Sequence, residues 1–422
     1  MALIKPFKPL RPTSRFAGAV AAPPYDAVSV EEARQILQNN PLSFLKVLKP
    51  EVNIPFYSNS KKTVYAEARN ALKEFINSGV FMQEEKLHFY IYTERADGRR
   101  QSGVVGLFSC KEYEESIIKR TEEIKYMDLE DRVQWIEHTN VQGGPVFLVY
   151  KEKGTVREII NKVMKEPPEY DFVTEDGVRH TVHSISEKGM IKGVQSAFMD
   201  IPTLYIADGN HGTLAACEVN KKRGGVSGFF LAAAVARTEV NIMEYNRVVK
   251  DLNGFSQERF LQRLKQYFYV EKIGNHTVKP SKKHTLDMYL DKGWYKLIIK
   301  ENYIGKANPL ESLDVYFLEK YVLQTILGIN SERGNERIDF VSGKEGMSTL
   351  EEKVNKEGWA VSFALFPVAV SEVIQVADSG FLMPPKSTWF EPKFRSGLFL
   401  NPLKDILAEF KNEKTEDYNI WF

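Results

Sequence analysis

The fold of this chain depends on Leu204-Tyr-Ile-Ala-Asp-Gly-Asn-His-Gly-Thr-Leu-Ala-Ala-Cys-Glu-Val219, in which an apolar run, a polar loop and a helical pattern follow one another. Residues 204–207 are apolar, have the length of a buried strand and lie between Pro202 and Gly209. The residues after Thr213 predict a helix that begins behind the Thr213 hydroxyl as its cap. The stretch therefore predicts an interior strand, a glycine loop and a helix.

The loop at the centre of this stretch, residues 208–213, combines features that suit phosphate binding. The first N–H groups of a helix and the positive end of its dipole attract anions. Gly209 and Gly212 allow the backbone to approach an anion closely, while Asp208 and His211 supply a carboxylate and an imidazole. The alternative is an ordinary turn, because Asp-Gly and Asn-His-Gly are common turn formers. The number of polar residues in the loop favours binding.

The composition indicates a protein of two or three domains, because 422 residues exceed the size of one ordinary core. The 57 basic and 56 acidic residues leave a net charge of +1, which creates no field that would attract nucleic acid or an anionic membrane. Cys110 and Cys217 are the only cysteines and lie far apart in sequence, which favours a reducing cytoplasm over a disulfide scaffold. We find no segment of signal or membrane-span length, so we expect a cytoplasmic location without a membrane partner. The oligomeric state does not follow from the sequence.

Helical and strand patterns alternate irregularly along the chain and predict a mixed α+β fold. Helices are expected from Ser29, over 64–77 and over 313–327, and a turn and a strand are expected over 40–51. Strands are expected over 87–93, 102–109, 146–150 and 229–236, the first two as a hairpin.

These patterns divide the chain into four parts. We expect an N-terminal α+β domain over 1–150, a central part with the glycine loop over 151–250, an α+β insertion over 251–310, and a C-terminal part over 311–422 that completes the site.

A second candidate binding loop lies between Asp378 and Gly397. Rigid prolines alternate in it with cations, hydroxyls, a carboxylate and an aromatic pair. Prolines fix the direction of the backbone and lower the entropy lost when long side chains are placed. Because ordering Lys and Arg is costly, a loop of this composition favours binding over packing alone. The candidate side chains are those of Lys386, Ser387, Thr388, Trp389, Glu391, Lys393 and Arg395.

Two further regions contain candidates for phosphate or metal chemistry. The segment 117–123 brings Arg120 and Glu122 close together, and such carboxylates and guanidinium groups hold magnesium and phosphate. The alternative is a solvated surface with ordinary charge pairs. The residues 338–346 repeat the pattern of strand, glycine loop and helix around Lys344, which is also how α/β proteins turn their corners. His180 and His183 lack the spacing of a zinc site.

Taken together, five motifs resemble those of the bacterial and archaeal domain-of-unknown-function 1015 family. Besides the loop at 208–213 they are Ala22-Pro-Pro-Tyr-Asp26, Asn246-Arg-Val-Val-Lys250, Arg337-Ile-Asp-Phe-Val341 and Met383-Pro-Pro-Lys-Ser-Thr-Trp-Phe-Glu-Pro-Lys393. The central loop is also similar to the Asp-Gly-x-His-Arg loop of the ParB/sulfiredoxin-like superfamily, which includes free-serine kinases. The resemblance implies a ParB/sulfiredoxin-like core with additional α+β subdomains, and phosphate or nucleotide binding at the loop.

The same resemblance places Asp208, Gly209 and His211 on matching positions. Asn210 stands where many relatives have His, and Gly212 stands where they have Arg. Loss of that guanidinium removes a bidentate phosphate clamp. The clamp is then expected from Lys386, Lys393, Arg395 or Arg120, or the activity is weakened or changed.

We therefore expect a small-molecule phosphotransferase similar to a serine kinase, with free serine or a similar metabolite as its partner. Asp208, Glu122 or, in reserve, Glu391 would accept the hydroxyl proton, and His211 would contact phosphate or orient the carboxylate. The predicted phosphate-binding residues include Gly209, Asn210 and Thr213 of the loop, with Trp389 as a wall of the pocket. Magnesium is the expected metal, and diphosphate, ADP or ATP is the expected donor.

Two alternatives stay open at the level of the sequence. The missing Arg favours a phosphate- or nucleotide-binding protein without turnover, whereas the acid–base residues favour an enzyme. A role on DNA, by analogy with ParB, is disfavoured by charge neutrality and by the absence of a basic recognition helix.

Overall fold

The computed structural model describes residues 1–54, 60–123, 126–224, 228–274, 279–305, 307–331, 335–408 and 410. The chain forms two compact units. Unit 1 contains residues 1–119, 125–240 and 392–422, and unit 2 contains residues 120–124 and 241–391. Residues 411–422, with the aromatic pair Trp421-Phe422, lie outside the described residues.

Unit 1 is organised around a nine-stranded mixed sheet with the order β6-β11-β8-β12-β5-β4-β10-β9, in which β1 also pairs with β5. The turn at Asp97 and Gly98 joins β4 to β5, and both residues have the positive φ, 51° and 73°, that tight hairpins require. Parallel pairs join β11 to β6 and β12 to β8, and the other pairs are antiparallel. The strands are β1 (Ile4–Lys5), β4 (Phe89–Ala96), β5 (Arg99–Ser109), β6 (Ile118–Lys119), β8 (Val146–Tyr150), β9 (Tyr170–Val173), β10 (Arg179–Ile185), β11 (Leu204–Asp208) and β12 (Phe229–Ala236).

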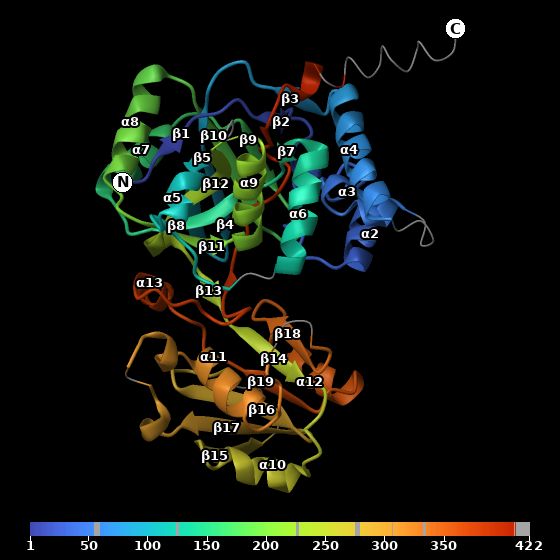
Figure 1. The fold of residues 1–422 in the computed structure, drawn as a ribbon, viewed down its shortest axis with the longest axis vertical. Coiled ribbons are helices and arrows are strands. Elements are labelled where there is room, and N and C mark those ends of the chain that lie inside the picture. Colours follow the sequence, from blue (N-terminus) through green and yellow to red (C-terminus); the bar gives the residue numbers. More distant parts are fainter. Residues whose placement is uncertain are drawn as a thin grey trace. The chain divides into compact units, whose positions relative to one another are not determined.

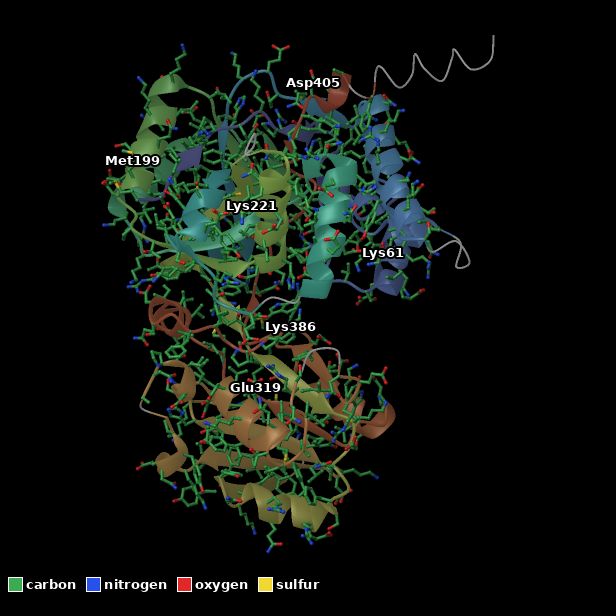
Figure 2. The ribbon with its side chains drawn as sticks, viewed as in Figure 1. Lys61, Met199, Lys221, Glu319, Lys386 and Asp405 are labelled. Carbon is green, nitrogen blue, oxygen red and sulfur yellow. The ribbon has the colours of Figure 1, made fainter. Side chains whose placement is uncertain are left out.

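Helices pack around this sheet. Figure 1 shows α9, α6 and α4 side by side, in agreement with their contacts. The helices of unit 1 are α1 (Ala17–Val20), α2 (Val30–Asn39), α3 (Leu45–Leu48), α4 (Lys61–Asn77), α5 (Cys110–Glu114), α6 (Tyr126–Thr139), α7 (Gly154–Val163), α8 (Lys188–Met199) and α9 (Asn210–Lys222). Lys61, Met199 and Lys221 mark the outside of α4, α8 and α9 (Figure 2). Short pairs join β2 (Leu10–Pro12) to β3 (Phe81–Gln83) and β7 (Val141–Gln142) to β21 (Asn401–Pro402).

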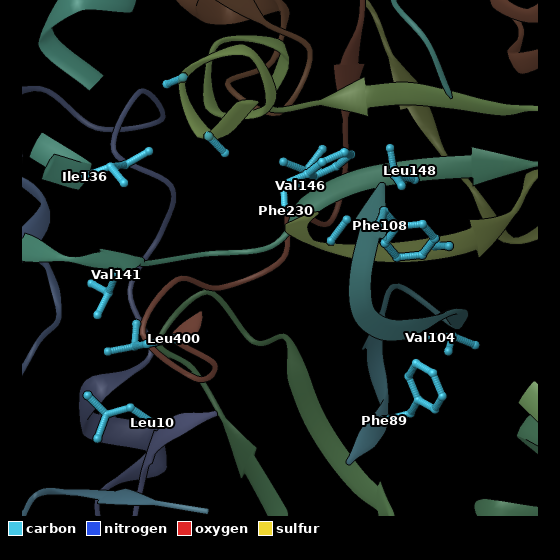
Figure 3. Close-up of a cluster of buried hydrophobic side chains, with 14 of the residues drawn as sticks. Leu10, Phe89, Val104, Phe108, Ile136, Val141, Val146, Leu148, Phe230 and Leu400 are labelled. Atoms are coloured by element: carbon cyan, nitrogen blue, oxygen red, sulfur yellow. The ribbon is translucent and has the colours of Figure 1, made fainter. Parts of the chain in front are cut away.

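The main core of unit 1 is built from apolar residues of alternating strand positions and of the helices that cover them. Phe89, Val104, Phe108, Leu148 and Phe230 come from four neighbouring strands and are fully or almost fully buried (Figure 3). Because successive strand residues point to opposite faces, this alternation fixes the register of the sheet. The intervening residues Tyr90, Tyr92, Phe147 and Val149 point to the other face, on which the candidate site lies.

Unit 2 has its own six-stranded sheet, with the order β15-β17-β16-β19-β14-β18 and antiparallel pairs throughout. Its strands are β14 (Tyr245–Val249), β15 (Phe268–Gly274), β16 (Thr285–Leu290), β17 (Gly293–Ile299), β18 (Ile338–Ser342) and β19 (Val361–Ala364), and β13 (Ile242–Met243) pairs with β20 (Trp389–Phe390). Its helices are α10 (Gln257–Leu264), α11 (Asp314–Phe317), the π-helix Leu318–Gln324, α12 (Met347–Lys356) and α13 (Val370–Asp378). A second hydrophobic core, separate from that of unit 1, fills this unit.

The mixed α+β class predicted from the sequence is confirmed, as are the hairpin and the strands at 146–150 and 229–236. The helix expected from Ser29 forms α2, and Ser29 and Glu32 make a capping box. The expectation of a strand over 40–51 is wrong, because this segment contains α3 and a short 3₁₀ turn, Pro50–Asn53. The helix expected over 313–327 is present as α11 followed by the π-helix.

The four parts expected from the sequence do not coincide with the two units. Residue 150 is the last residue of β8, an interior strand of the large sheet, and residues 392–402 return to unit 1 after the whole of unit 2. Such a return is decided by tertiary contacts and has no local sequence signal. Within the described ranges, we find no helix long and apolar enough to cross a membrane.

Candidate functional site

The junction of β11 and α9 has the predicted order of strand, glycine and helix, but the helix begins earlier than expected. Gly209 has φ 93° and is the residue that precedes the first helical residue, Asn210. Since no side chain caps α9, the expectation that Thr213 caps the helix is wrong. Thr213 is fully buried inside the first turn, and its hydroxyl donates to the Gly209 carbonyl at 3.1 Å. The glycine, rather than a hydroxyl, allows the chain to turn directly into the helix.

An irregularity in β11 determines where Asp208 points. The pairing of β11 with β8 shifts between Ile206 and Asp208, so that Asp208 rather than Ala207 lies opposite Phe147. Directly opposite residues in an antiparallel pair share a face of the sheet, so Asp208 lies on the face of Phe147. One carboxylate oxygen of Asp208 accepts the N–H of Gly209 at 2.9 Å.

Residues Pro392–Ser396, which we call the strap, run across this face of the sheet. Lys393 of the strap donates to the second carboxylate oxygen of Asp208, and the two side chains are 15% and 26% exposed. Phe394 packs on Phe147 with 5.1 Å between ring centroids. The ammonium–carboxylate pair therefore lies at the beginning of α9 and stays partly open to solvent.

Arg395, a second predicted phosphate ligand, has other partners. Its guanidinium donates to Asp176 at 2.5 Å and to Thr174 at 3.4 Å. Of the cations predicted to neutralise phosphate, Lys386, Lys393 and Arg395, it is Lys393 that pairs with Asp208. Arg395 instead belongs to a buried network with His180 and Tyr92.

His180 is fully buried between two hydroxyl groups. Its Nδ1 lies 2.8 Å from the Tyr92 hydroxyl and its Nε2 lies 3.0 Å from the Thr174 hydroxyl. Burial, and then the charge of Arg395, lower the pKa of His180 to about 3. Burial likewise raises the pKa of Tyr92 well above its usual range. His180 is thus neutral and Tyr92 is protonated across the physiological pH range.

The other residues of the glycine loop are half-buried. Asn210 and His211 occupy the first turn of α9, and Asn210 Oδ1 is buried without a hydrogen-bond partner among the described residues. A Cβ added at Gly212 would have only Val146 near it, at 4.0 Å, within the part of the chain that the structure describes. The described residues therefore leave open space beside Gly212.

Unit 2 contains the remaining predicted residues in a group of its own. Glu122 accepts the backbone N–H of Lys386 at 2.9 Å, and Met383 donates to the carbonyl of Thr121 at 2.9 Å. Arg247, fully buried, donates to the carbonyls of Lys386 and Pro385 at 3.1 and 3.3 Å. These contacts hold Lys386 in a left-handed conformation, with φ 57°. Glu122 thus anchors a loop through one of its oxygens.

Most polar groups of this loop are also engaged within unit 2. Glu391 accepts from Lys344 at 2.8 Å and from the Trp389 indole at 2.9 Å. The Ser387 hydroxyl is buried and donates to the Pro384 carbonyl at 2.6 Å. Arg120 is exposed, and Thr388 is half-buried. Lys344 of the second glycine loop therefore pairs with Glu391 of the proline-rich loop.

The described residues would supply a magnesium ion with few protein ligands. No group of three or more His, Cys, Asp or Glu side chains among them is arranged to hold a metal ion. Magnesium bound with a phosphate needs only one or two carboxylates, and Asp208 is the carboxylate that would supply one. Magnesium stays a prediction, and its contribution would be to neutralise phosphate oxygens.

Several buried polar residues around the site were not singled out from the sequence. Gln101, Tyr92 and Glu94 lie on β5 and β4, where alternating patterns indicate only that a residue faces inward. The feature that could have identified them in the sequence is a polar residue at a strand position that faces inward. Such a residue is unusual unless it has a hydrogen-bond partner. Arg247 carries the same signal in β14.

Comparison with solved structures finds loosely similar chains, and no curated protein matches the sequence. A C-terminally truncated SbnI from Staphylococcus aureus has a TM-score of 0.39 and 13% identity, with 74% of this chain and 97% of that chain covered. A free serine kinase in complex with AMP has a TM-score of 0.37 and 14% identity, with 73% and 93% covered. A conserved hypothetical protein from Pyrococcus furiosus has a TM-score of 0.36 and 14% identity, with 70% and 94% covered. At these values no residue role is transferred to this chain.

The family comparison is more extensive. The sequence model of one family matches residues 4–316, about three quarters of the chain, and covers the glycine loop, the large sheet and part of unit 2. Three of the five motifs noted in the sequence, at 22–26, 208–213 and 246–250, lie within the matched residues. The chain therefore belongs to the family described as "Protein of unknown function (DUF1015)".

Proposed function

We propose that this protein is a small-molecule phosphotransferase whose acceptor is the hydroxyl of free serine or of a similar metabolite. The observation that supports the proposal is the Asp208–Lys393 pair at the beginning of α9. A carboxylate, an ammonium group and the first N–H groups of a helix are three elements that phosphoryl transfer uses. The residual exposure of both side chains allows a ligand to reach them.

In the proposed reaction, the phosphate groups of diphosphate, ADP or ATP bind at the beginning of α9, and Lys393 moves from Asp208 towards them. The oxygen of Asp208 released in this way accepts the proton of the acceptor hydroxyl. The new O–P bond forms while the bond to the departing phosphate group breaks. Helix N–H groups and Lys393 neutralise the oxygens of the transferred group.

A phosphate- or nucleotide-binding protein without turnover is the second candidate. It is favoured by the occupied oxygens of Asp208, which accept from Gly209 and Lys393, and by glycine at position 212 in place of a phosphate-clamping Arg. The two candidates share the ligand and differ in whether a phosphoryl group is transferred to an acceptor.

The test is incubation of the protein with serine, magnesium and, in turn, diphosphate, ADP and ATP, followed by detection of phosphoserine. Asp208→Asn keeps the size of the side chain and removes the base, so it is expected to bind the donor but to form no product. Lys393→Met is expected to lose both binding and transfer. Lys111→Met, which disturbs only an exposed pair with Glu115, is the matched control. Tight donor binding with no product from any donor would support the second candidate instead.

The predicted residues of unit 2 are tested in the same assay. Glu122→Gln keeps the acceptor for the Lys386 N–H and removes the negative charge. Loss of transfer in this variant, with donor binding intact, would make Glu122 rather than Asp208 the proton acceptor. We expect no such loss, because Glu122 serves as a backbone anchor.

A further inference from the structure

The strap is anchored on both sides of Lys393. On one side, the Gln101 side-chain amide donates to the Pro392 carbonyl at 3.2 Å. On the other side, the Arg395 backbone N–H donates to the Tyr92 hydroxyl at 3.3 Å. Both anchors lie within unit 1 and on strands of the large sheet. Lys393 is thus fixed between two points, and its reach towards Asp208 depends on them.

The Gln101 anchor has a fixed orientation. Gln101 lies opposite Glu94 in the β4–β5 pair, and its Nε2 donates to Glu94 at 2.9 Å as well as to Pro392. Gln101 is 2% exposed and Glu94 is fully buried. Because both partners are acceptors, rotation of the amide would place its oxygen against them. The amide nitrogen therefore must face the strap.

The Tyr92 anchor depends on a neutral His180. The Tyr92 oxygen accepts the N–H of Arg395, and in the neutral tautomer that carries its proton on Nε2, His180 accepts from Tyr92 at Nδ1. This tautomer fits Thr174, whose hydroxyl donates to Asp176 at 2.6 Å and so accepts from His180 Nε2. Because neutral His180 keeps its hydrogen bonds to Tyr92 and Thr174, it holds the Tyr92 hydroxyl in place without a change of charge.

Gly103 provides the space in which the strap lies. It is opposite Tyr92 in the β4–β5 pair, and a Cβ at this position would lie 2.9 Å from the end of the Phe394 ring. Phe394 also packs on Tyr92, with 5.0 Å between ring centroids. A larger residue at position 103 would therefore push Phe394, and with it the strap, away from the sheet.

From these contacts we propose that Gln101, Tyr92 and Gly103 are positioning residues that hold the ammonium group of Lys393 at Asp208 and at the beginning of α9. The consequence for phosphate binding rests on the proposed function. The placement of Lys393 does not, because it can be measured without a ligand.

The experiment is acylation of lysine amines in the full chain, with the rate at each lysine followed by mass spectrometry. Gln101→Leu removes the donor, Gln101→Glu keeps the shape but replaces the donor with an acceptor, and Gly103→Ala displaces Phe394. The Gln101 variants are expected to raise the acylation rate of Lys393 roughly five-fold, the change expected for loss of one hydrogen bond, and Gly103→Ala is expected to raise it by displacing the strap. The exposed Lys111 is the internal reference.

The matched control is Gln83→Leu. Gln83 also donates from its side-chain amide to a backbone carbonyl, that of Lys8 at 2.6 Å, but it does not touch the strap. Its replacement is expected to leave the Lys393 rate unchanged. Circular dichroism selects the folded variants, and Gly103→Ala carries the test if the Gln101 variants do not fold.

The outcomes separate the inference from the proposed function. Unchanged Lys393 acylation in the folded Gln101 and Gly103 variants, or an equal rise in Gln83→Leu, overturns the inference. A rise confined to the strap variants supports it. If added diphosphate or ADP protects Lys393 of the wild type from acylation, the proposed function is supported. If neither protects Lys393 but the strap variants still raise its acylation rate, the proposed function is contradicted and the positioning role of the three residues stands.

Discussion

Lys393 and Asp208 place opposite charges at the beginning of a helix, and their separate replacement should have opposite effects on phosphate binding. Loss of the ammonium group in Lys393→Met leaves the negative charge of Asp208 to repel phosphate. We expect diphosphate affinity to fall about tenfold or more, since hydrogen bonds to charged groups are worth about 1.5–3 kcal/mol. Asp208→Asn should retain or increase that affinity. Isothermal titration measures both, and an equal loss in the two variants would contradict this assignment of charges.

The buried side chain of Asp287 should lower the free energy of unfolding by an amount that depends on pH. It is fully buried, and both of its carboxylate oxygens are without a hydrogen-bond partner among the described residues. Burial raises the pKa of Asp287 from 3.8 to about 6. The folded state then binds the proton more tightly than the unfolded state, so the free energy of unfolding falls as pH rises from about 4 to about 6.

Asp287→Asn should remove this pH dependence and stabilise unit 2 above pH 6 by at most about 3 kcal/mol, the value of the pKa difference. Asp314→Asn is the matched control, because Asp314 is also buried but accepts from the His284 backbone at 3.0 and 2.9 Å. That variant should be less stable than the wild type. Urea unfolding between pH 4.5 and 8 checks both, and a loss of stability in Asp287→Asn would show that its carboxylate has partners.

At the scale of elements, the β11–α9 junction depends on one backbone conformation. Gly209 has φ 93°, whereas the nearest atoms to a Cβ there, those of Val146, are at an ordinary 3.4 Å. Gly209→Ala should therefore cost about 1–2 kcal/mol through backbone strain rather than through a clash. We also expect weaker diphosphate binding, because the first turn of α9 would shift.

Gly224→Ala tests whether that effect is local. Gly224 follows the other end of α9, has φ 70° and has open space around it among the described residues. It should cost similar stability but leave diphosphate binding unchanged. Thermal unfolding and titration of both variants give the comparison, and equal binding losses would show that binding follows stability rather than the loop.

The sequence predicted these elements unevenly, for physical reasons. The strand 204–207 and its glycine loop were predictable, because an apolar run bounded by proline and glycine is a local signal. The first residue of α9 was not predictable, because the sequence offers both Gly209 and the Thr213 hydroxyl as residues that could begin the helix. Five of the seven residues 42–48 are apolar, and so short a run does not distinguish a strand from a helix.

The candidate site was predictable only in part. The residue types in the two loops indicated phosphate chemistry, and the structure brings Lys393 to Asp208 across 185 positions of sequence. The β-bulge that aims Asp208 and the contacts of Gln101 and Arg247 depend on strand neighbours, which no local pattern specifies.

At the scale of the whole molecule, two units with separate hydrophobic cores should unfold as separate cooperative transitions. Scanning calorimetry is expected to show two transitions. Asp287→Asn should shift one of them, and Gly209→Ala should shift the other. A single transition moved by both variants would show that the units unfold as one.

In the proposed function, phosphate binds where Lys393, Asp208 and the beginning of α9 meet. The most direct test is a crystal structure of the protein with ADP or diphosphate bound. We expect phosphate oxygens within hydrogen-bonding distance of Lys393 Nζ and of the first N–H groups of α9, with Lys393 drawn away from Asp208. A phosphate group bound elsewhere, with the Lys393–Asp208 pair intact, would contradict it.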